Sequence, residues 1–160
     1  SCFSCGGRKA KPDPLFSDYN YDDKTYNYGG IVEIPFKQHG GVRTVQVKIN
    51  DCAEFPMIFD TGCSGVAISI LELGTLVKHG YISEEDVIGM TRAQIADGSI
   101  VENMVFNIKE MVIGGKIVCS DVDVTVSNNI SAPMLLGNGV FDRISSFSID
   151  NANKQIIFHL

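Results

Sequence analysis

Short β-rich runs separated by turn residues extend through most of this sequence, and this pattern constrains the fold more than any other feature. The clearest runs are 31–36, 44–49 and 55–59, which are rich in Val, Ile and Phe. Two later runs flank Ala96-Asp97-Gly98, and Asp-Gly between β runs is a strong hairpin signal. The pattern predicts a mostly-β fold, a barrel or sandwich of short strands.

The second half of the chain continues this pattern. We expect strands at 91–95, 100–108, 110–113, 117–118, 122–126 and 133–137, and a last hairpin formed by 147–150 and 155–158. A short helix is expected between them at 138–143, although Gly139 within it and Gly137 just before it make that helix less regular.

One segment predicts a full helix. Its apolar residues recur on one face at helical spacing: Ile70, Leu73, Leu76 and Val77. Ser69 and Glu72 have the spacing of a capping box, and Gly80 is placed to end the helix in a left-handed conformation. A brief second helical turn is expected to begin at Ser83.

Length and composition restrict the kinds of protein to consider. A chain of 160 residues suits one domain, and we predict an N-terminal arm or linker over 1–28 and a single domain over 29–160. No apolar run approaches the roughly 18 residues of a membrane helix. The net charge of -6 and the pI of about 4.9 argue against a nucleic-acid partner.

Five cysteines are an odd number, so at least one is unpaired or bridges to another chain. Cys2 and Cys5 form a CxxC pair, but neither a second pair nor a nearby His pair completes a zinc set. We therefore expect no metal and no cofactor. A cysteine so close to the start is compatible with lipid modification, which favours a bacterial cell envelope or periplasm while leaving the localisation open.

An acidic residue lies where the apolar run 55–59 ends. Asp60 is followed by Thr61 and Gly62. A pair of adjacent carboxyl groups can hydrolyse an amide, because one acts as base toward water while the other gives a proton to the carbonyl. The apolar run would bury such an acid, the Thr hydroxyl would tie the loop, and Gly permits close backbone approach. By itself the tripeptide is a weak signal of function and is more often only a turn at the end of a strand.

The order of elements around Asp60 resembles the retropepsin-like aspartic peptidases, single-domain relatives of pepsin. The resemblance covers roughly residues 31 to 160. Its matching motifs in chain order are Phe59-Asp60-Thr61-Gly62-Cys63-Ser64, the helix, Ala96-Asp97-Gly98, Ile113-Gly114-Gly115, Leu135-Leu136-Gly137 and Phe147-Ser148-Ile149-Asp150. The resemblance implies a closed barrel of short strands with one main helix and a flap hairpin.

The resemblance also implies roles for individual residues. Asp60 would be the catalytic acid, Thr61 would hydrogen-bond across a twofold axis, and Gly62 would face the substrate backbone. The flap that covers the substrate would have Ala96, Asp97 and Gly98 at its tip, although Asp97 is explained equally well as a turn residue. Five residues would support the catalytic loop: Cys63, Ser64, Leu135, Leu136 and Gly137. The N-terminal segment and strand 156–160 would supply the dimer sheet.

The Asp-Thr-Gly motif occurs once, so a second carboxylate must come from another chain through a twofold axis. We therefore expect a homodimeric endopeptidase that cleaves a peptide or protein substrate. Pepsin-like members commonly have a hydroxyl residue directly after the motif, whereas this chain has Cys63. Because a thiol is a weaker partner for the carboxylate, we expect activity at mildly rather than strongly acidic pH.

Other interpretations remain open at this point. The chain could be a catalytically silent member that keeps the fold as a dimerisation or peptide-binding module. It could also be a lipid-anchored envelope protein in which Cys2 carries the lipid. Cys63 could act as a redox switch, although an unpaired cysteine is more often a small buried hydrophobic residue.

Overall fold

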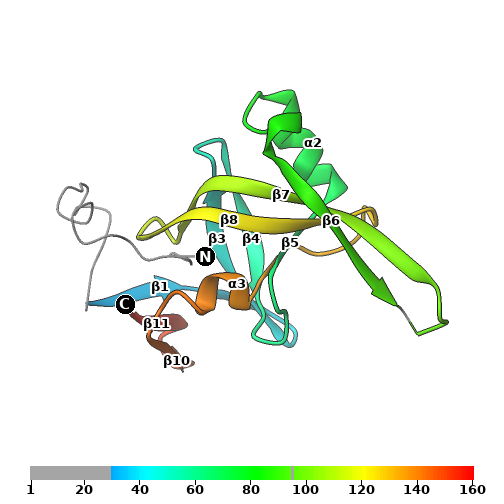
Figure 1. The fold of residues 1–160 in the computed structure, drawn as a ribbon. Coiled ribbons are helices and arrows are strands. Elements are labelled where there is room, and N and C mark those ends of the chain that lie inside the picture. The colour runs from blue at the N-terminus through cyan, green and yellow to red at the C-terminus, as the bar shows by residue number, and fades with distance from the viewer. Residues whose placement is uncertain (1–29, 95) are drawn as a thin grey trace.

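The structure is a computed structural model that describes residues 30–94 and 96–160, and this part of the chain is mostly β (Figure 1). One sheet has the strand order β2-β3-β4-β9-β5-β8-β7-β6, and a smaller one has the order β1-β11-β10. The predicted arm 1–28 and residue Ile95 lie outside the described residues. Among those described, no helix is long and apolar enough to cross a membrane.

The strands of the larger sheet are β2 (Lys37–His39), β3 (Val42–Ile49), β4 (Ala53–Phe59), β5 (Val66–Ser69), β6 (Val87–Gln94), β7 (Ile100–Ile113), β8 (Ile117–Ser127) and β9 (Leu135–Leu136). The smaller sheet contains β1 (Ile31–Pro35), β10 (Ser146–Asp150) and β11 (Gln155–His159). The helical elements are α2 (Ile70–Lys78), the 3-10 turn η2 (Glu84–Asp86) and α3 (Asn138–Phe141).

The prediction of a mostly-β fold is confirmed, but several expected strand ends are wrong. The expected pieces 100–108 and 110–113 form one strand, β7, and β8 likewise joins two expected pieces. In β7 the alternation of buried and exposed residues slips at Lys109 and Glu110, which are both exposed. Opposite them, Asp121 of β8 has a left-handed φ of 54°. This local irregularity interrupts the apolar pattern without ending either strand.

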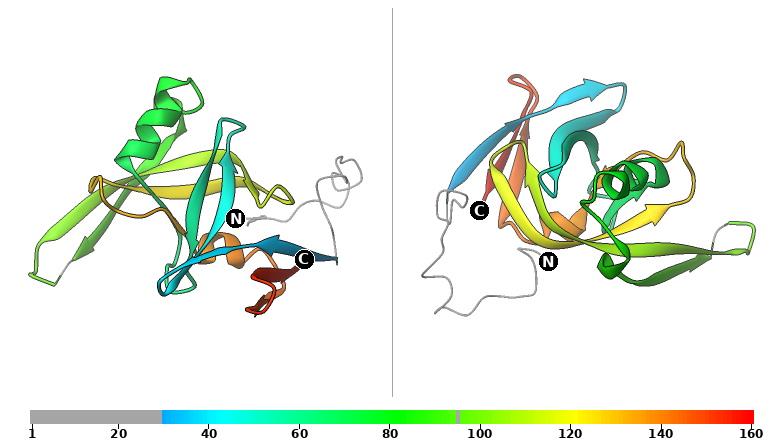
Figure 2. Two further views of the ribbon diagram at one scale, coloured as in Figure 1. Left: turned by 180° about the vertical axis from the view of Figure 1, so that it is seen from behind. Right: turned by 90° about the horizontal axis from the view of Figure 1, so that it is seen from above.

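The larger sheet curls around the core. β7 pairs along most of its length with β8, and its far end also pairs with β3, where Val47 lies opposite Ile113. The strand pairings therefore return to β3, and the curl is visible from above in Figure 2. Fully buried side chains from these strands fill the interior: Val45, Val47, Ile49, Met57, Ile108, Met111 and Val124.

The short strand β9 lies between β4 and β5. It runs parallel to β4, with Phe59 opposite Leu136, and antiparallel to β5, with Val66 opposite the same leucine. Leu136 is completely buried. Both β4 and β5 therefore pair with β9. The loop that joins β4 to β5, residues 60–65, begins at the end of this shared pairing.

Helix α2 begins and ends as predicted. The Ser69 side chain and Glu72 form the capping box, and Gly80 has a φ of 77° beyond the last turn. Leu73 and Leu76 are buried, whereas Ile70 and Val77 are exposed on the surface. The predicted helix is confirmed, but only a narrow stripe of its apolar face packs on β5 and β8.

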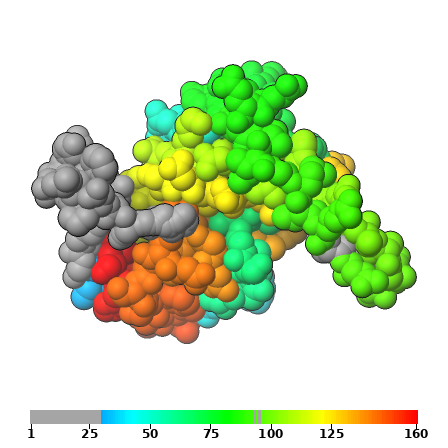
Figure 3. Space-filling model, viewed as in Figure 1, coloured from blue at the N-terminus to red at the C-terminus, as the bar shows by residue number. Residues whose placement is uncertain are grey.

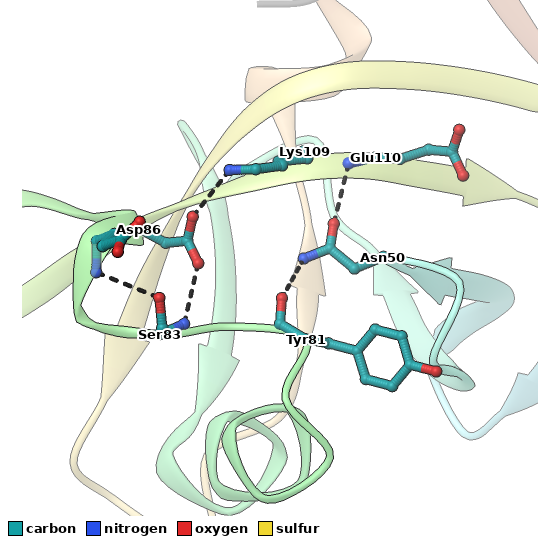
Figure 4. A network of polar contacts seen from close by, with 7 residues as sticks. Asn50, Tyr81, Ser83, Asp86, Lys109 and Glu110 are labelled. Carbon is teal, nitrogen blue, oxygen red and sulfur yellow. Dashed lines mark hydrogen bonds and ion pairs between the residues drawn. The ribbon is translucent and has the colours of Figure 1, made fainter.

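A network of polar contacts joins the loops near the base of the β6–β7 hairpin to β7 (Figure 4). Asn50, which has a φ of 47°, donates from its amide to the Tyr81 carbonyl at 3.0 Å and accepts from the Glu110 N–H at 3.0 Å. One side chain thereby satisfies backbone groups of two separate segments. The network fixes the segment after α2 against the strand that forms half of the hairpin.

Asp86 supplies the second half of this network. Its carboxylate accepts the Ser83 N–H at 2.9 Å and pairs with Lys109 at 3.0 Å. The Ser83 hydrogen bond, followed by Lys109, lowers the pKa of Asp86 below its usual 3.8. A carboxylate with a lowered folded-state pKa adds stability above about pH 4, and that contribution is lost as the pH falls through the lowered value.

We therefore predict that Asp86→Asn lowers the free energy of unfolding by about 1 kcal/mol near neutral pH. The difference from wild type should shrink at an acid pH below the lowered pKa of Asp86, where the Asp86 carboxyl is itself protonated. Urea unfolding at both pH values measures this, with Glu84→Gln in the same turn as control. If the difference in the free energy of unfolding between wild type and Asp86→Asn stayed constant with pH, a stabilising role of the Asp86 carboxylate would be contradicted.

In the smaller sheet, β11 lies between β1 and β10 and pairs antiparallel with both (Figure 1). Both edges of β11, which contains most of the strand expected at 156–160 to contribute to a dimer sheet, are paired within one chain. The edges of this sheet are β1 and β10.

Candidate active site

Asp60 lies at the point where β4 ends, and its position is fixed by backbone hydrogen bonds. Its N–H donates to the Leu136 carbonyl at 3.0 Å, which extends the pairing of β4 with β9 by one residue. One carboxylate oxygen, Oδ1, accepts the Gly62 N–H at 2.9 Å. The Cys63 N–H closes the turn onto the Asp60 carbonyl at 3.2 Å. The side chain is half-buried, so the carboxylate is oriented by the turn and still meets solvent.

The loop is held from behind by the residues that follow β9. A Cβ atom on Gly137 would lie 2.3 Å from the Gly65 carbonyl oxygen and 2.4 Å from that of Cys63. Since these are backbone atoms of the loop, only glycine permits this close approach. The predicted supporting role of Leu135, Leu136 and Gly137 is consistent with this packing.

Asn138 is a contact of the site that the sequence did not single out. Its N–H donates to the Cys63 carbonyl at 2.9 Å, and its side-chain amide donates to the Thr61 carbonyl at 3.0 Å. These two hydrogen bonds hold the loop at both Thr61 and Cys63. Its place directly after Leu-Leu-Gly was the available signal, but no residue pattern connects it with a loop 77 residues earlier.

A cluster of four phenylalanines packs at the base of the loop. The ring of Phe59, the residue before Asp60, lies 4.5 Å from Phe141, 5.0 Å from Phe147 and 6.3 Å from Phe158. These rings come from β4, α3, β10 and β11. The cluster therefore couples the position of Asp60 to the smaller sheet.

The other predicted loop residues differ in their surroundings. Thr61, Gly62 and Ser64 are exposed beside Asp60, where a ligand could reach them. Cys63 is half-buried, and its thiol lies 3.5 Å from the Gly65 carbonyl oxygen, to which it donates. The structure thus places the thiol on the loop backbone and shows no contact between it and the Asp60 carboxylate.

The predicted hairpin tip is exposed and projects from the body of the molecule (Figure 3). Asp97 accepts from the Ser99 N–H at 2.8 Å and from its hydroxyl at 2.6 Å, and these bonds lower the pKa of Asp97. Gly98 has a φ of 90°. These features make Asp97 a turn residue. The structure does not bring Ala96, Asp97 or Gly98 into contact with Asp60.

One face of the hairpin carries exposed apolar side chains. Met90 lies opposite Met104 in the β6–β7 pairing, and the two are 56% and 37% exposed. Further along β7 the same face carries Phe106 and Ile108, which are buried in the core. The apolar hairpin face is therefore the outward continuation of the face that covers the core.

A surface hollow of about 340 Å³ lies beside the strand that carries Asp60. Phe55, Pro56 and Ile58 of β4 line it, together with Pro133 and Met134 from the segment before β9. The Ile58 N–H donates to the Met134 carbonyl at 2.8 Å, so the two walls are joined by the backbone. The hollow is mainly apolar and begins two residues before Asp60.

Comparison with known proteins agrees with this arrangement. A family model described as aspartyl protease matches residues 45–140, from β3 to α3. The chain therefore belongs to the aspartyl protease family. One similar solved structure is a retropepsin-like aspartic protease from Rickettsia conorii, with a TM-score of 0.57 and 17% identity over 83% of this chain and 94% of that one. This match shows the fold. The comparison with curated proteins gives no match.

Proposed function

We propose that the protein is an aspartic endopeptidase whose active site forms between two Asp60 side chains across a homodimer axis. The observation that carries the proposal is the oriented, half-buried Asp60 carboxylate at the end of β4, with Thr61 and Gly62 exposed beside it. The motif occurs once, so one chain supplies one carboxylate. A second copy would supply the other.

The chemistry follows from placing two carboxyl groups within a hydrogen bond of each other. Because two adjacent negative charges repel, the pair shares one proton, and one group is an acid while the other is a base. The base takes a proton from a water molecule that attacks the substrate carbonyl, and the acid protonates the carbonyl oxygen. The Gly62 N–H, which fixes Oδ1, keeps each carboxylate oriented for this exchange.

We further interpret the curled sheet as the closed barrel predicted from the sequence, because the β3–β7 pairing returns to β3. The β6–β7 hairpin would be the flap, with Ala96, Asp97 and Gly98 at its tip and its apolar face toward the substrate. The substrate would bind as an extended strand beneath it. The domain would cover 29–160, with 1–28 as an arm.

The apolar hollow beside β4 supports a preference among substrates. Phe55, Ile58 and Met134 would enclose an apolar side chain close to the cleaved bond. A peptide-library digest of wild type at roughly pH 4 to 6 tests the proposal. We expect cleavage next to large apolar residues and none in Asp60→Asn. Equal cleavage by both proteins would refute the proposal and leave a non-catalytic module of the same fold.

The working pH is a separate prediction, which depends on Cys63. We expect the pH–rate profile of wild type to peak at mildly acidic pH, since the residue after the motif offers a thiol that donates to Gly65. In Cys63→Ser, a hydroxyl can reach the carboxylate and favour its ionised form, so the acid limb should move to lower pH. A wild-type profile that peaked near pH 2 would contradict this.

A further inference from the structure

The apolar face of the β6–β7 hairpin also carries an ion pair. Arg92 lies opposite Glu102 in the strand pairing, two residues closer to the tip than the pair of methionines, Met90 and Met104. Because side chains alternate between the two faces of a strand, residues two positions apart share a face. The ion pair therefore lies on the face of the hairpin that continues into the buried core at Phe106.

The guanidinium of Arg92 is held by one of its three nitrogen atoms. Its Nε lies 2.7 Å from Oε2 of Glu102. The Arg92 side chain is 73% exposed and the Glu102 side chain 45%, so the guanidinium is the outer member of the pair. Within the described part of the chain, its two Nη groups have no hydrogen-bond partner. They form a planar fork that fits the two oxygen atoms of a carboxylate.

Arg92 is the one basic residue in the sequence from Val87 to Ile108. The acidic residue at the tip, Asp97, accepts from the N–H and the hydroxyl of Ser99, so its carboxylate is engaged within the turn. The hairpin therefore offers one localised positive group on a protein whose net charge is -6.

Apolar side chains lie on both sides of this ion pair. Toward the core its neighbours on the same face are Met90 and Met104, and toward the tip they are Gln94 and the exposed Ile100. Neighbouring pairs on one face of a sheet are close enough for long side chains to meet. A ligand that covered these apolar residues would exclude water from Arg92, which strengthens the attraction between the guanidinium and a negative charge.

We propose that Arg92 forms a subsite for an acidic side chain, so that the hairpin favours extended peptides with an aspartate or glutamate away from the cleaved bond. The inference rests on the proposed function, in which this face covers the substrate. Arg92 precedes the tip residue Asp97 by five positions, which is about 17 Å of extended strand. With the tip over the cleaved bond, the acidic residue would lie roughly three to five positions from that bond.

Glu102 both orients the subsite and limits its strength. Its carboxylate holds Nε and leaves the Nη fork of Arg92 free, but its negative charge also repels a second carboxylate. Removal of the Glu102 charge should therefore strengthen the preference for an acidic side chain. Removal of the Arg92 charge should leave an unpaired carboxylate, which attracts a basic side chain instead. An ion pair that served only to hold the two strands together would not produce these opposite effects.

Cleavage of matched peptides tests the subsite. All peptides share one cleaved bond and carry glutamate, glutamine or lysine at one position roughly three to five residues from it. At roughly pH 6, where a glutamate in the peptide is ionised, wild type should show a kcat/KM about three- to fivefold higher for glutamate than for glutamine. Arg92→Gln should abolish this preference and favour lysine, and Glu102→Gln should increase it at least roughly twofold. Lys37→Gln, on β2 at the opposite end of the strand order, should behave as wild type.

Binding to the Asp60→Asn variant separates this subsite from the proposed function. Fluorescence anisotropy with the same peptides should give the same order of affinity, glutamate above glutamine and glutamine above lysine. If wild type cleaves the peptides but does not distinguish glutamate from glutamine at any of these positions, the subsite is overturned while the proposed function stands. If no peptide is cleaved, the proposed function fails, and the affinities alone decide on the subsite: equal affinities for the glutamate and glutamine peptides would overturn it as well.

Discussion

Asp60→Asn is expected to lower kcat/KM for peptide cleavage by at least about a thousandfold, as loss of a catalytic carboxylate does in other peptidases. Asparagine has the same shape, and its side-chain oxygen can still accept the Gly62 N–H that Oδ1 accepts in the native chain. It can neither take a proton from water nor share one with a second carboxylate. The variant therefore changes the proton chemistry while keeping the loop.

Three measurements make this result specific. Cleavage of a fixed peptide gives the rate, sedimentation gives the oligomeric state, and thermal unfolding gives the stability. Asp123→Asn, which alters an exposed carboxylate on β8, should behave as wild type in all three. If Asp60→Asn retained more than a tenth of the activity, the carboxylate would not be the catalytic group.

The second large effect concerns packing behind the loop. Gly137→Ala is expected to lower the free energy of unfolding by about 3 kcal/mol and to abolish cleavage. The added methyl group would lie 2.3 Å from the Gly65 carbonyl oxygen and 2.8 Å from the Cys63 Cβ. Because two of the atoms it meets belong to the backbone, the loop or β9 must move.

Gly139→Ala is the matched control, two residues further along. There the closest atom to an added Cβ is the Gly65 Cα at 3.3 Å, and the position lies in α3, where alanine is the better helix former. The small steric cost of the added methyl group and the gain in helix propensity should nearly cancel, so urea unfolding of Gly139→Ala should show little change. Similar destabilisation by both substitutions would contradict the steric explanation, which depends on the contact of Gly137 alone.

Local patterns allowed much of the fold to be predicted. The strand runs, the capping box of Ser69 and Glu72, the left-handed Gly80 and the Asp97-Gly98 turn each depend on residues close together in the sequence, and the structure contains all of them. The ends of β7 and β8 could not be predicted. Their alternation slips beside Lys109 and Asp121, where pairing between the strands outweighs the apolar pattern.

The candidate site was predictable in part for the same reason. Asp60, Thr61 and Gly62 form a local motif, and a known order of elements supported it. The side-chain hydrogen bond from Asn138 to the loop joins residues that are 77 positions apart in the sequence. The pairing of β11 on both sides likewise depends on which strands meet in space. No pattern along the chain shows that β1 and β10 form the edges of the smaller sheet.

The central claim is that one active site requires Asp60 from two chains, and a subunit-mixing experiment tests it most directly. Wild type and Asp60→Asn are mixed in varying proportions at constant total protein, allowed to exchange subunits, and assayed for peptide cleavage. If only dimers with two Asp60 side chains are active, activity follows the square of the wild-type fraction, so an equal mixture retains about a quarter of the wild-type rate. A linear decline, with about half of the rate retained, would show that each chain acts alone and would contradict the account.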